Sequence, residues 1–206
     1  MSNNLQKFRD FKYSFCPVTP IRPGESKIEG WQSDSYVFKD VIDKYKPMTI
    51  VEIGSWLGAS ALHMSSLCEA HIICVDTYLG SNADLWREHK TKDLINNFSQ
   101  IYNQFCINIT SHFKNDYISP LPMTSSSAAE LFRDCDITAD LIYIDAGHQY
   151  KEVYDDLEAW FPLADKVLIG DDYSPRWPGV IQAVKTFTLE HNLAYDVSDS
   201  KFIIAK

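Results

Sequence analysis

The sequence predicts an α/β protein in which a mostly parallel sheet is covered by helices on both faces. Short apolar runs with the composition of buried strands alternate along the chain with segments whose apolar residues recur at helical spacing. Parallel strands need a crossover between them, and this alternation supplies one after each strand. The last two strand-like runs differ, because only a short turn separates them. They predict an antiparallel hairpin at the end of the sheet.

The chain length and composition fit one globular domain with a short N-terminal extension. The sequence has 206 residues, of which 45% are hydrophobic and 23% charged. Residues 1–28 contain Pro17, Pro20 and Pro23, followed by Gly24, and look irregular. We expect this segment to pack on the core or to act as a flap, and we expect residues 29–206 to form the domain.

The charge of the chain excludes some classes of partner. The net charge of −9 disfavours binding to nucleic-acid phosphates or to an anionic membrane surface. No run of about 18 apolar residues predicts a membrane span, and residues 1–17 lack the apolar stretch of a signal peptide. The five cysteines form no C-x-x-C pair and are interpreted as reduced. We therefore expect a cytoplasmic protein that binds neither nucleic acid nor a membrane, and leave open whether it forms a homo-oligomer.

The elements of the first half follow from caps, apolar spacing and prolines. Ser33 and Asp34 can cap a helix that runs to about Tyr45, and Pro47 stops it. The elements expected next are a strand over 49–53, a helix over 59–67, a strand over 71–76 and a helix through Leu94, Phe98, Ile101 and Phe105.

The second half repeats the alternation and then changes it. A serine-rich cluster at 124–127 can cap a helix over 128–133. The other elements expected here are strands over 117–120, 140–145 and 166–170, helices over 150–161 and 179–189, and final strands over 193–197 and 201–205. Asp199 and Ser200 lie between the final strands and are suited to a tight turn.

The turn after the first strand predicts a binding site for an adenosine-type ligand without a pyrophosphate. Gly54 and Gly58 form G-x-x-x-G rather than the G-x-G-x-x-G of a pyrophosphate clamp. Asp76 ends the second strand, where an acid can accept hydrogen bonds from both ribose hydroxyls. Glu52 lies beneath the turn and could bind an amino group through water or hold the loop. The alternative is a plain strand-to-helix turn.

Three aspartates are expected to converge at the carboxyl ends of two neighbouring strands. Asp145 ends one strand, and Asp171 and Asp172 end the next. Ligands of open α/β sheets bind at this edge. Three carboxylates there repel one another unless a cation or hydrogen bonds relieve the repulsion, and oxygen ligands favour Mg²⁺, Ca²⁺ or Mn²⁺. The alternative is that they cap helices or bind substrate directly.

His148 follows Asp145 by three residues and is expected near the same edge. Its imidazole could take a proton from an acceptor hydroxyl at neutral pH. The alternative is a loop histidine that orients the carboxylates or packs on Tyr150.

Four segments together resemble one family: 51–60, 75–81, 144–150 and 170–173. They resemble the class I S-adenosylmethionine-dependent methyltransferases of the methyltransferase 24 type, a group that includes metal-dependent O-methyltransferases of macrolide and aminocoumarin sugars. The resemblance covers roughly residues 29–190. It implies a Rossmann-like three-layer α/β/α sandwich, with a mostly parallel seven-stranded sheet that ends in an antiparallel C-terminal hairpin.

The resemblance also implies ligands for particular residues. S-adenosylmethionine would lie on the turn over 52–60, with Asp76 on the ribose and Ser125 or Ser126 near the adenine. The cofactor-binding residues expected are Glu52, Gly54, Ser55, Trp56, Gly58, Ser60, Asp76, Thr77, Ser125, Ser126 and Asp145. A divalent cation, Mg²⁺, is implied on Asp145, Asp171 and Asp172.

The function implied is transfer of a methyl group from S-adenosylmethionine to a hydroxyl of a small molecule, such as a sugar or another secondary metabolite. Asp145 and His148 are the expected catalytic residues. The sugar enzymes carry an aspartate as base two residues after the first metal ligand; Gly147 stands there in this chain, and His148 is the nearest replacement. Tyr173, Arg176 and Trp177 are expected to line the acceptor pocket. Trp31 is expected to close over that pocket.

Two other functions compete with this interpretation. A nicotinamide-dependent oxidoreductase would need a pyrophosphate clamp, which the turn after Gly54 lacks. A degenerate cofactor-binding domain acting as a regulator or interaction module would be expected to lose the acidic edge, yet all three aspartates are present.

Overall fold

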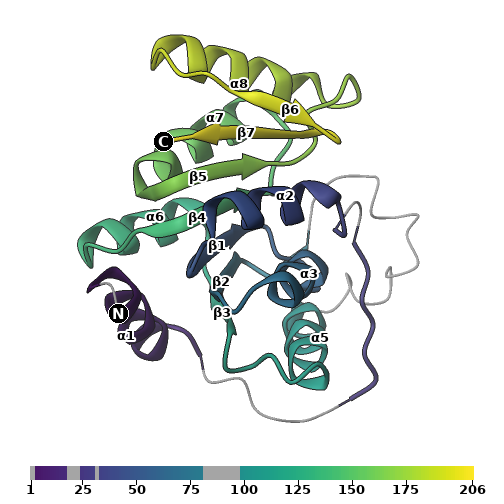
Figure 1. The fold of residues 1–206 in the computed structure, drawn as a ribbon. Coiled ribbons are helices and arrows are strands. Elements are labelled where there is room, and N and C mark those ends of the chain that lie inside the picture. The colour runs from purple at the N-terminus through teal and green to yellow at the C-terminus, as the bar shows by residue number, and fades with distance from the viewer. Residues whose placement is uncertain (1–2, 18–23, 31–32, 81–97) are drawn as a thin grey trace.

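The computed structural model describes residues 3–17, 24–30, 33–80 and 98–206, and within them one sheet lies between two layers of helices (Figure 1). The helices are α1 (Asn3–Phe15), α2 (Tyr36–Tyr45), α3 (Ala59–Leu67), α5 (Phe98–Ser111), α6 (Ser125–Asp134), α7 (Tyr150–Trp160), the 3₁₀ turn η2 (Phe161–Leu163) and α8 (Pro178–Glu190). The strands are β1 (Thr49–Ile53), β2 (His71–Asp76), β3 (Ile118–Pro122), β4 (Ala139–Ile144), β5 (Ala164–Gly170), β6 (Asp196–Ser198) and β7 (Lys201–Ala205).

The sheet confirms the predicted fold class. Its seven strands within the described ranges run in the order β3-β2-β1-β4-β5-β7-β6. Neighbours from β3 to β5 are parallel, whereas β7 is antiparallel to both β5 and β6. The predicted turn at Asp199 and Ser200 is confirmed as well. Both residues have positive φ, 48° and 58°, as the tight turns that match strand twist require.

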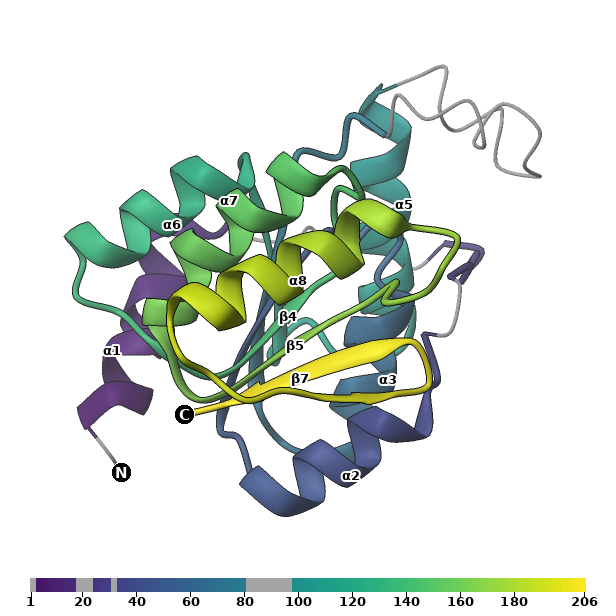
Figure 2. The same cartoon turned by 90° about the horizontal axis from the view of Figure 1, so that it is seen from above.

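Side chains of the strands alternate between two apolar cores. Val51 and Ile53 point into the core beneath α1, α6, α7 and α8, whereas Ile50 points into the core beneath α2, α3 and α5. Figure 2 shows α6, α7 and α8 on one side of the sheet and α2 and α3 on the other. Both faces are therefore covered, which explains why β1 is buried at every residue.

The N-terminal segment differs from the expectation. The interpretation of residues 1–28 as irregular is wrong for Asn3–Phe15, which form α1. Phe8 and Phe11 are buried, and the Phe11 ring centroid lies 4.6 Å from that of Phe132 on α6. The first helix is thus part of the core. Trp31 and Leu94 lie outside the described residues.

Element boundaries also differ from the prediction. The cap of α2 is Ser35, which accepts a hydrogen bond from the Val37 amide, so the prediction of Ser33 and Asp34 as caps is wrong. The final hairpin begins later than expected, because β6 covers Asp196–Ser198 rather than 193–197. The helix expected over 128–133 begins earlier, at Ser125, since Thr124 is its N-cap and accepts a hydrogen bond from the Ser127 amide. Across the described ranges, none of the helices has both the length and the apolar character needed to cross a bilayer.

The strand order reverses between β1 and β4. From β1 the chain continues through β2 and β3 on one side, whereas β4 and β5 lie on the other. Ligands of open α/β sheets bind where the strand order reverses, at the carboxyl ends of the strands. Ile53 pairs with Ile144 at this point, so the glycine turn and Asp145 follow side by side.

Candidate functional site

The glycine turn lies directly against the end of β4. Gly54 has φ 89°, and a Cβ built on it would lie 1.9 Å from the carbonyl oxygen of Asp145. Only glycine permits this approach. Gly58 has φ 83°, and a Cβ there would lie 3.0 Å from the Phe105 ring. The two glycines therefore allow the first turn, β4 and α5 to lie close together.

Asp76 fixes the shape of the turn. Its Oδ2 accepts a hydrogen bond from the Trp56 amide at 2.8 Å, and its Oδ1 accepts one from the Tyr78 amide at 2.7 Å. Burial raises the pKa of Asp76. A carboxylate oxygen can accept more than one hydrogen bond, so Asp76 retains capacity for two ribose hydroxyls. Thr77, the next residue, is exposed.

Glu52 lies beneath the turn and is fully buried. The Ser60 hydroxyl of α3 donates a hydrogen bond to Oε1, and the Cys74 thiol of β2 lies 3.4 Å from Oε2. Burial raises the pKa of Glu52. These contacts match the loop-holding alternative, because the carboxyl group links β1, β2 and α3. Ser55 and Ser60 are buried beside it.

The serines expected near an adenine lie at the start of α6. The Ser125 hydroxyl donates to Asp156 and accepts a hydrogen bond from Trp160 Nε1 at 2.8 Å. Ser126, in contrast, is exposed. Because α6 follows β3, which pairs with β2, both serines lie on the same side of β1 as Asp76.

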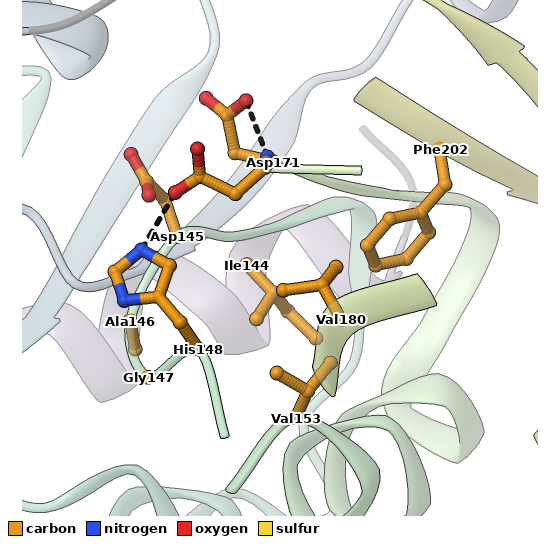
Figure 3. Close-up of a pocket in the computed structure, with 10 residues that line it drawn as sticks. Ile144, Asp145, Ala146, Gly147, His148, Val153, Asp171, Val180 and Phe202 are labelled. Carbon is orange, nitrogen blue, oxygen red and sulfur yellow. Dashed lines mark hydrogen bonds and ion pairs between the residues drawn. The ribbon is translucent and has the colours of Figure 1, made fainter. Parts of the chain in front are cut away.

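The acidic edge brings together Asp145, His148 and Asp172, and Figure 3 shows Asp145 and His148 side by side in the pocket there. One ligand atom from each lies within 4.8 Å of the others. His148 Nε2 lies 2.6 Å from Asp172 Oδ2. Burial, together with the charges of Asp171 and Asp172, raises the pKa of Asp145 well above its usual value. The pocket there is lined by Ile144, Asp145, Ala146, Gly147, His148, Val153, Asp171, Asp172, Val180 and Phe202.

Asp171 has a different set of partners. The buried ammonium of Lys201 donates to its Oδ2, and the Tyr143 hydroxyl lies 2.6 Å from the same oxygen. Its Oδ1 accepts a hydrogen bond from the Asp172 amide at 2.7 Å. Two of the three aspartates expected as metal ligands are thus grouped with His148, whereas Asp171 is turned toward Lys201.

The donor set at the edge fits a divalent cation. Metal–oxygen distances of about 2.0–2.6 Å allow one ion to bridge carboxylate oxygens that lie this close together. Asp145 and Asp172 supply carboxylate oxygens, which suit Mg²⁺ and Mn²⁺, while His148 Nε2 lies 2.6 Å from Asp172 Oδ2. Burial first, and then the charges of Asp171 and Asp172, raise the pKa of Asp145, and a bound cation would favour its ionised form.

The His148 ring is held on its face by Trp177. The two ring centroids are 4.1 Å apart with 20° between the planes, and the Arg176 guanidinium lies 5.4 Å from the Trp177 ring centroid. Trp177 thus contacts His148, and Arg176 contacts Trp177; their place beside an acceptor stays a prediction. Tyr173 instead pairs with Tyr195 through their hydroxyls, 2.9 Å apart.

Gly147 has no room for a side chain. A Cβ there would lie 2.8 Å from the Cβ of Glu152. Glu152 closes the capping box of α7 by accepting a hydrogen bond from the Gln149 amide. An aspartate at position 147 would therefore disrupt the start of α7, which leaves His148 as the titratable side chain of this loop.

Sequence reasoning missed Lys201 and Tyr143. A lysine at the first residue of a strand normally indicates an exposed edge, and Tyr143 follows the pattern of a buried strand. Their partnership with Asp171 comes from the register, in which β7 pairs with β5 and β5 with β4. The short turn at Asp199 could have indicated this position of Lys201. The turn begins an antiparallel strand, so the first residue of that strand lies near the carboxyl end of β5.

Comparisons with known proteins agree with this geometry. A family model described as a methyltransferase domain matches residues 51–173, more than half of the chain. No curated protein gives a significant match.

Solved structures share the fold at low identity. A protein from Klebsiella pneumoniae assigned as an O-methyltransferase aligns with a TM-score of 0.60 and 15% identity, over 100% of this chain and 90% of that one. An O-methyltransferase from Bacillus cereus in complex with S-adenosylhomocysteine gives 0.58 and 15%, over 100% and 90%. The calicheamicin methyltransferase CalS11 gives 0.57 and 15%, over 99% and 91%.

Proposed function

This chain belongs to the methyltransferase 24 family of methyltransferase domains, and from that premise we propose that it transfers a methyl group from S-adenosylmethionine to a hydroxyl of a small molecule, assisted by a divalent cation. The observation that carries the proposal is that the glycine turn and the acidic edge lie side by side, where a shared crevice would form at the reversal of the strand order. Gly54, at the end of β1, packs against the backbone of Asp145, at the end of β4. A cofactor on the turn and an acceptor at the acidic edge would therefore be neighbours.

The cofactor would lie on the β1 side of the crevice. The turn over 54–58 offers backbone without a side chain at both glycines, and Asp76 would accept the ribose hydroxyls. Asp76 already clamps the Trp56 amide, so its carboxylate is fixed before a ligand arrives. Ser126 is accessible on the adenine side. The structure of the Bacillus cereus enzyme with S-adenosylhomocysteine supports this assignment by fold.

Asp145 and Asp172 would hold the cation. When bound, S-adenosylmethionine supplies an electrophilic methyl group, and a divalent cation favours the ionised form of an acceptor hydroxyl. The two carboxylates, on adjacent strand ends, would orient the acceptor toward the β1 side. Nearness of this kind accounts for much of the rate in group transfer.

His148 would accept the proton of the acceptor hydroxyl at one ring nitrogen. Trp177 fixes the ring plane and Asp172 bonds Nε2, so the imidazole is held at the edge rather than free in solution. A carboxylate partner on one nitrogen stabilises the protonated ring that results. Gly147 leaves no second carboxyl group in this loop for the task.

The acceptor is proposed to be a small hydroxylated molecule, either a sugar or another secondary metabolite. CalS11, named as a TDP-rhamnose 3′-O-methyltransferase, shares the fold. The stacked pair of Trp177 and His148 offers a flat surface beside the carboxylates, which suits a ring that carries adjacent hydroxyls.

Two measurements test the proposal. Calorimetry with S-adenosylhomocysteine should give binding at a single site, and an absence of heat at millimolar ligand would remove the cofactor. Radiolabelled methyl transfer to a panel of catechols and nucleotide sugars should require added Mg²⁺ or Mn²⁺ and stop with EDTA. Turnover that EDTA does not change would remove the cation from the reaction.

A further inference from the structure

A buried lysine lies under the acidic edge. Lys201 is 0% exposed, and its ammonium contacts Asp171 and lies 5.2 Å and 5.6 Å from the ring centroids of Phe38 and Tyr143. Burying an ammonium is costly unless it is paired. The position is therefore maintained by a specific partnership, namely with Asp171 and the faces of two aromatic rings.

The final hairpin places this lysine. The Tyr173 amide donates to the Ser200 carbonyl at 2.8 Å, and the Ser35 hydroxyl donates to Asp199 at 2.6 Å. These contacts tie the turn to the loop after β5 and to the cap of α2. Lys201, the next residue, is thus positioned by a turn that is anchored at two points.

Asp171 has partners on both carboxylate oxygens. Oδ2 receives the Lys201 ammonium and lies within hydrogen-bond distance of the Tyr143 hydroxyl, and Oδ1 receives the Asp172 amide. Asp172 has φ 60°, a strained backbone conformation for a residue with a side chain. The bond from its amide to Asp171 Oδ1 stabilises this conformation, which turns the Asp172 carboxylate toward His148 and Asp145.

We propose that Lys201 is an internal counter-cation that withdraws Asp171 from the metal-ligand set, so that Asp145 and Asp172 hold the divalent ion and Asp171 is a positioning residue. This inference rests on the proposed function. It differs from the ligand set expected from sequence, in which Asp171 binds the metal directly. The geometry supports it, because the Lys201 ammonium and the Tyr143 hydroxyl both contact Asp171 Oδ2, and the Asp172 amide donates to Oδ1.

The test is Mn²⁺ binding to the cofactor-free protein, measured from the loss of the electron paramagnetic resonance signal of free Mn²⁺. The paired variant Asp171→Asn with Lys201→Met keeps the local charge, and the asparagine oxygen can still accept the Asp172 amide. We expect its Mn²⁺ dissociation constant to stay within about tenfold of the wild-type value, whereas Asp172→Asn weakens binding by more than about 100-fold.

Single variants sharpen the test. Lys201→Met removes a positive charge and releases Asp171, so Mn²⁺ should bind at least about tenfold more tightly. Lys166→Met is the matched control, since it also breaks a lysine–aspartate pair, with Asp140, but at the opposite end of the strands. It should leave Mn²⁺ binding unchanged. Circular dichroism verifies that each variant folds. If Lys201→Met does not fold, the paired variant alone still tests the inference.

The outcomes separate this inference from the proposed function. If the paired variant loses Mn²⁺ as severely as Asp172→Asn, Asp171 is a ligand and the inference is overturned while the metal site remains. If the wild-type protein binds no Mn²⁺ at all, both the inference and the metal assistance are overturned. Binding of S-adenosylhomocysteine in the same sample then reports whether the cofactor assignment still holds.

Discussion

At the scale of single residues, the site depends on side chains whose surroundings the sequence could not reveal. The types and order of Gly54, Asp76, Asp145 and Asp172 were predictable, because each ends a recognisable strand. The partners of Asp171 were not, since they come from β7 across the sheet. A sequence pattern identifies which carboxyl groups meet at an edge, but not which of them a buried lysine neutralises.

His148 gives the sharpest prediction at this scale. If it accepts the proton of the acceptor, His148→Gln should lower kcat by about 100-fold or more at neutral pH. The calorimetric affinity for S-adenosylhomocysteine should not change, because the ring contacts Asp172 and Trp177 rather than the glycine turn. Steady-state kinetics with an acceptor identified in the panel measure the effect. A kcat within a few-fold of the wild-type value would assign His148 a structural role.

At the scale of elements, the N-terminal helix is the clearest difference between sequence and structure. The prolines at 17, 20 and 23 favour an irregular segment. The apolar residues just before them nevertheless recur at helical spacing, namely Leu5, Phe8, Phe11 and Phe15. The helix has no acidic residue in its first turn and a polar average composition, so its stability comes from packing rather than from intrinsic propensity.

The packing of α1 can be tested with two phenylalanines of the same helix. Phe11 is 3% exposed and Phe15 is 46% exposed. Phe11→Ala should lower the free energy of unfolding by about 3–5 kcal/mol, and Phe15→Ala should lower it by less than about 1 kcal/mol. Urea denaturation measures both. Equal losses would mean that α1 does not pack on the core as described.

Helix α7 carries a buried acid that should make stability depend on pH. Burial raises the pKa of Asp156 to about 6, above the value of about 3.9 in an unfolded chain. The protonated carboxyl group contributes to the stability of the folded state. This contribution is complete at pH values below the pKa of the unfolded chain, and it is lost as the pH rises through the pKa of the folded protein.

Replacement of that acid should flatten the pH profile. Between about pH 4 and pH 7, the free energy of unfolding of the wild-type protein should fall by about 1–3 kcal/mol more than that of Asp156→Asn. Asp155→Asn is the control, because Asp155 is exposed and pairs with Lys151. Urea denaturation at a series of pH values gives the slopes. Parallel profiles for wild type and Asp156→Asn would contradict a raised pKa.

At the scale of the whole molecule, the strand order explains why distant segments form one site. The alternation of strands and helices and the short final turn were enough to predict a parallel sheet with a terminal hairpin, and the structure has both. Register and neighbour choice decide the rest. Because β1 lies between β2 and β4, the glycine turn meets Asp76 on one side and Asp145 on the other.

A crystal structure of the protein with S-adenosylhomocysteine and Mn²⁺ tests the shared crevice most directly. The account predicts density for the adenosyl group over the turn at 54–58 with its ribose on Asp76. It also predicts an anomalous Mn²⁺ peak between Asp145 and Asp172, on the other side of the same opening. An adenosyl group bound elsewhere, or a manganese peak remote from both aspartates, would contradict it.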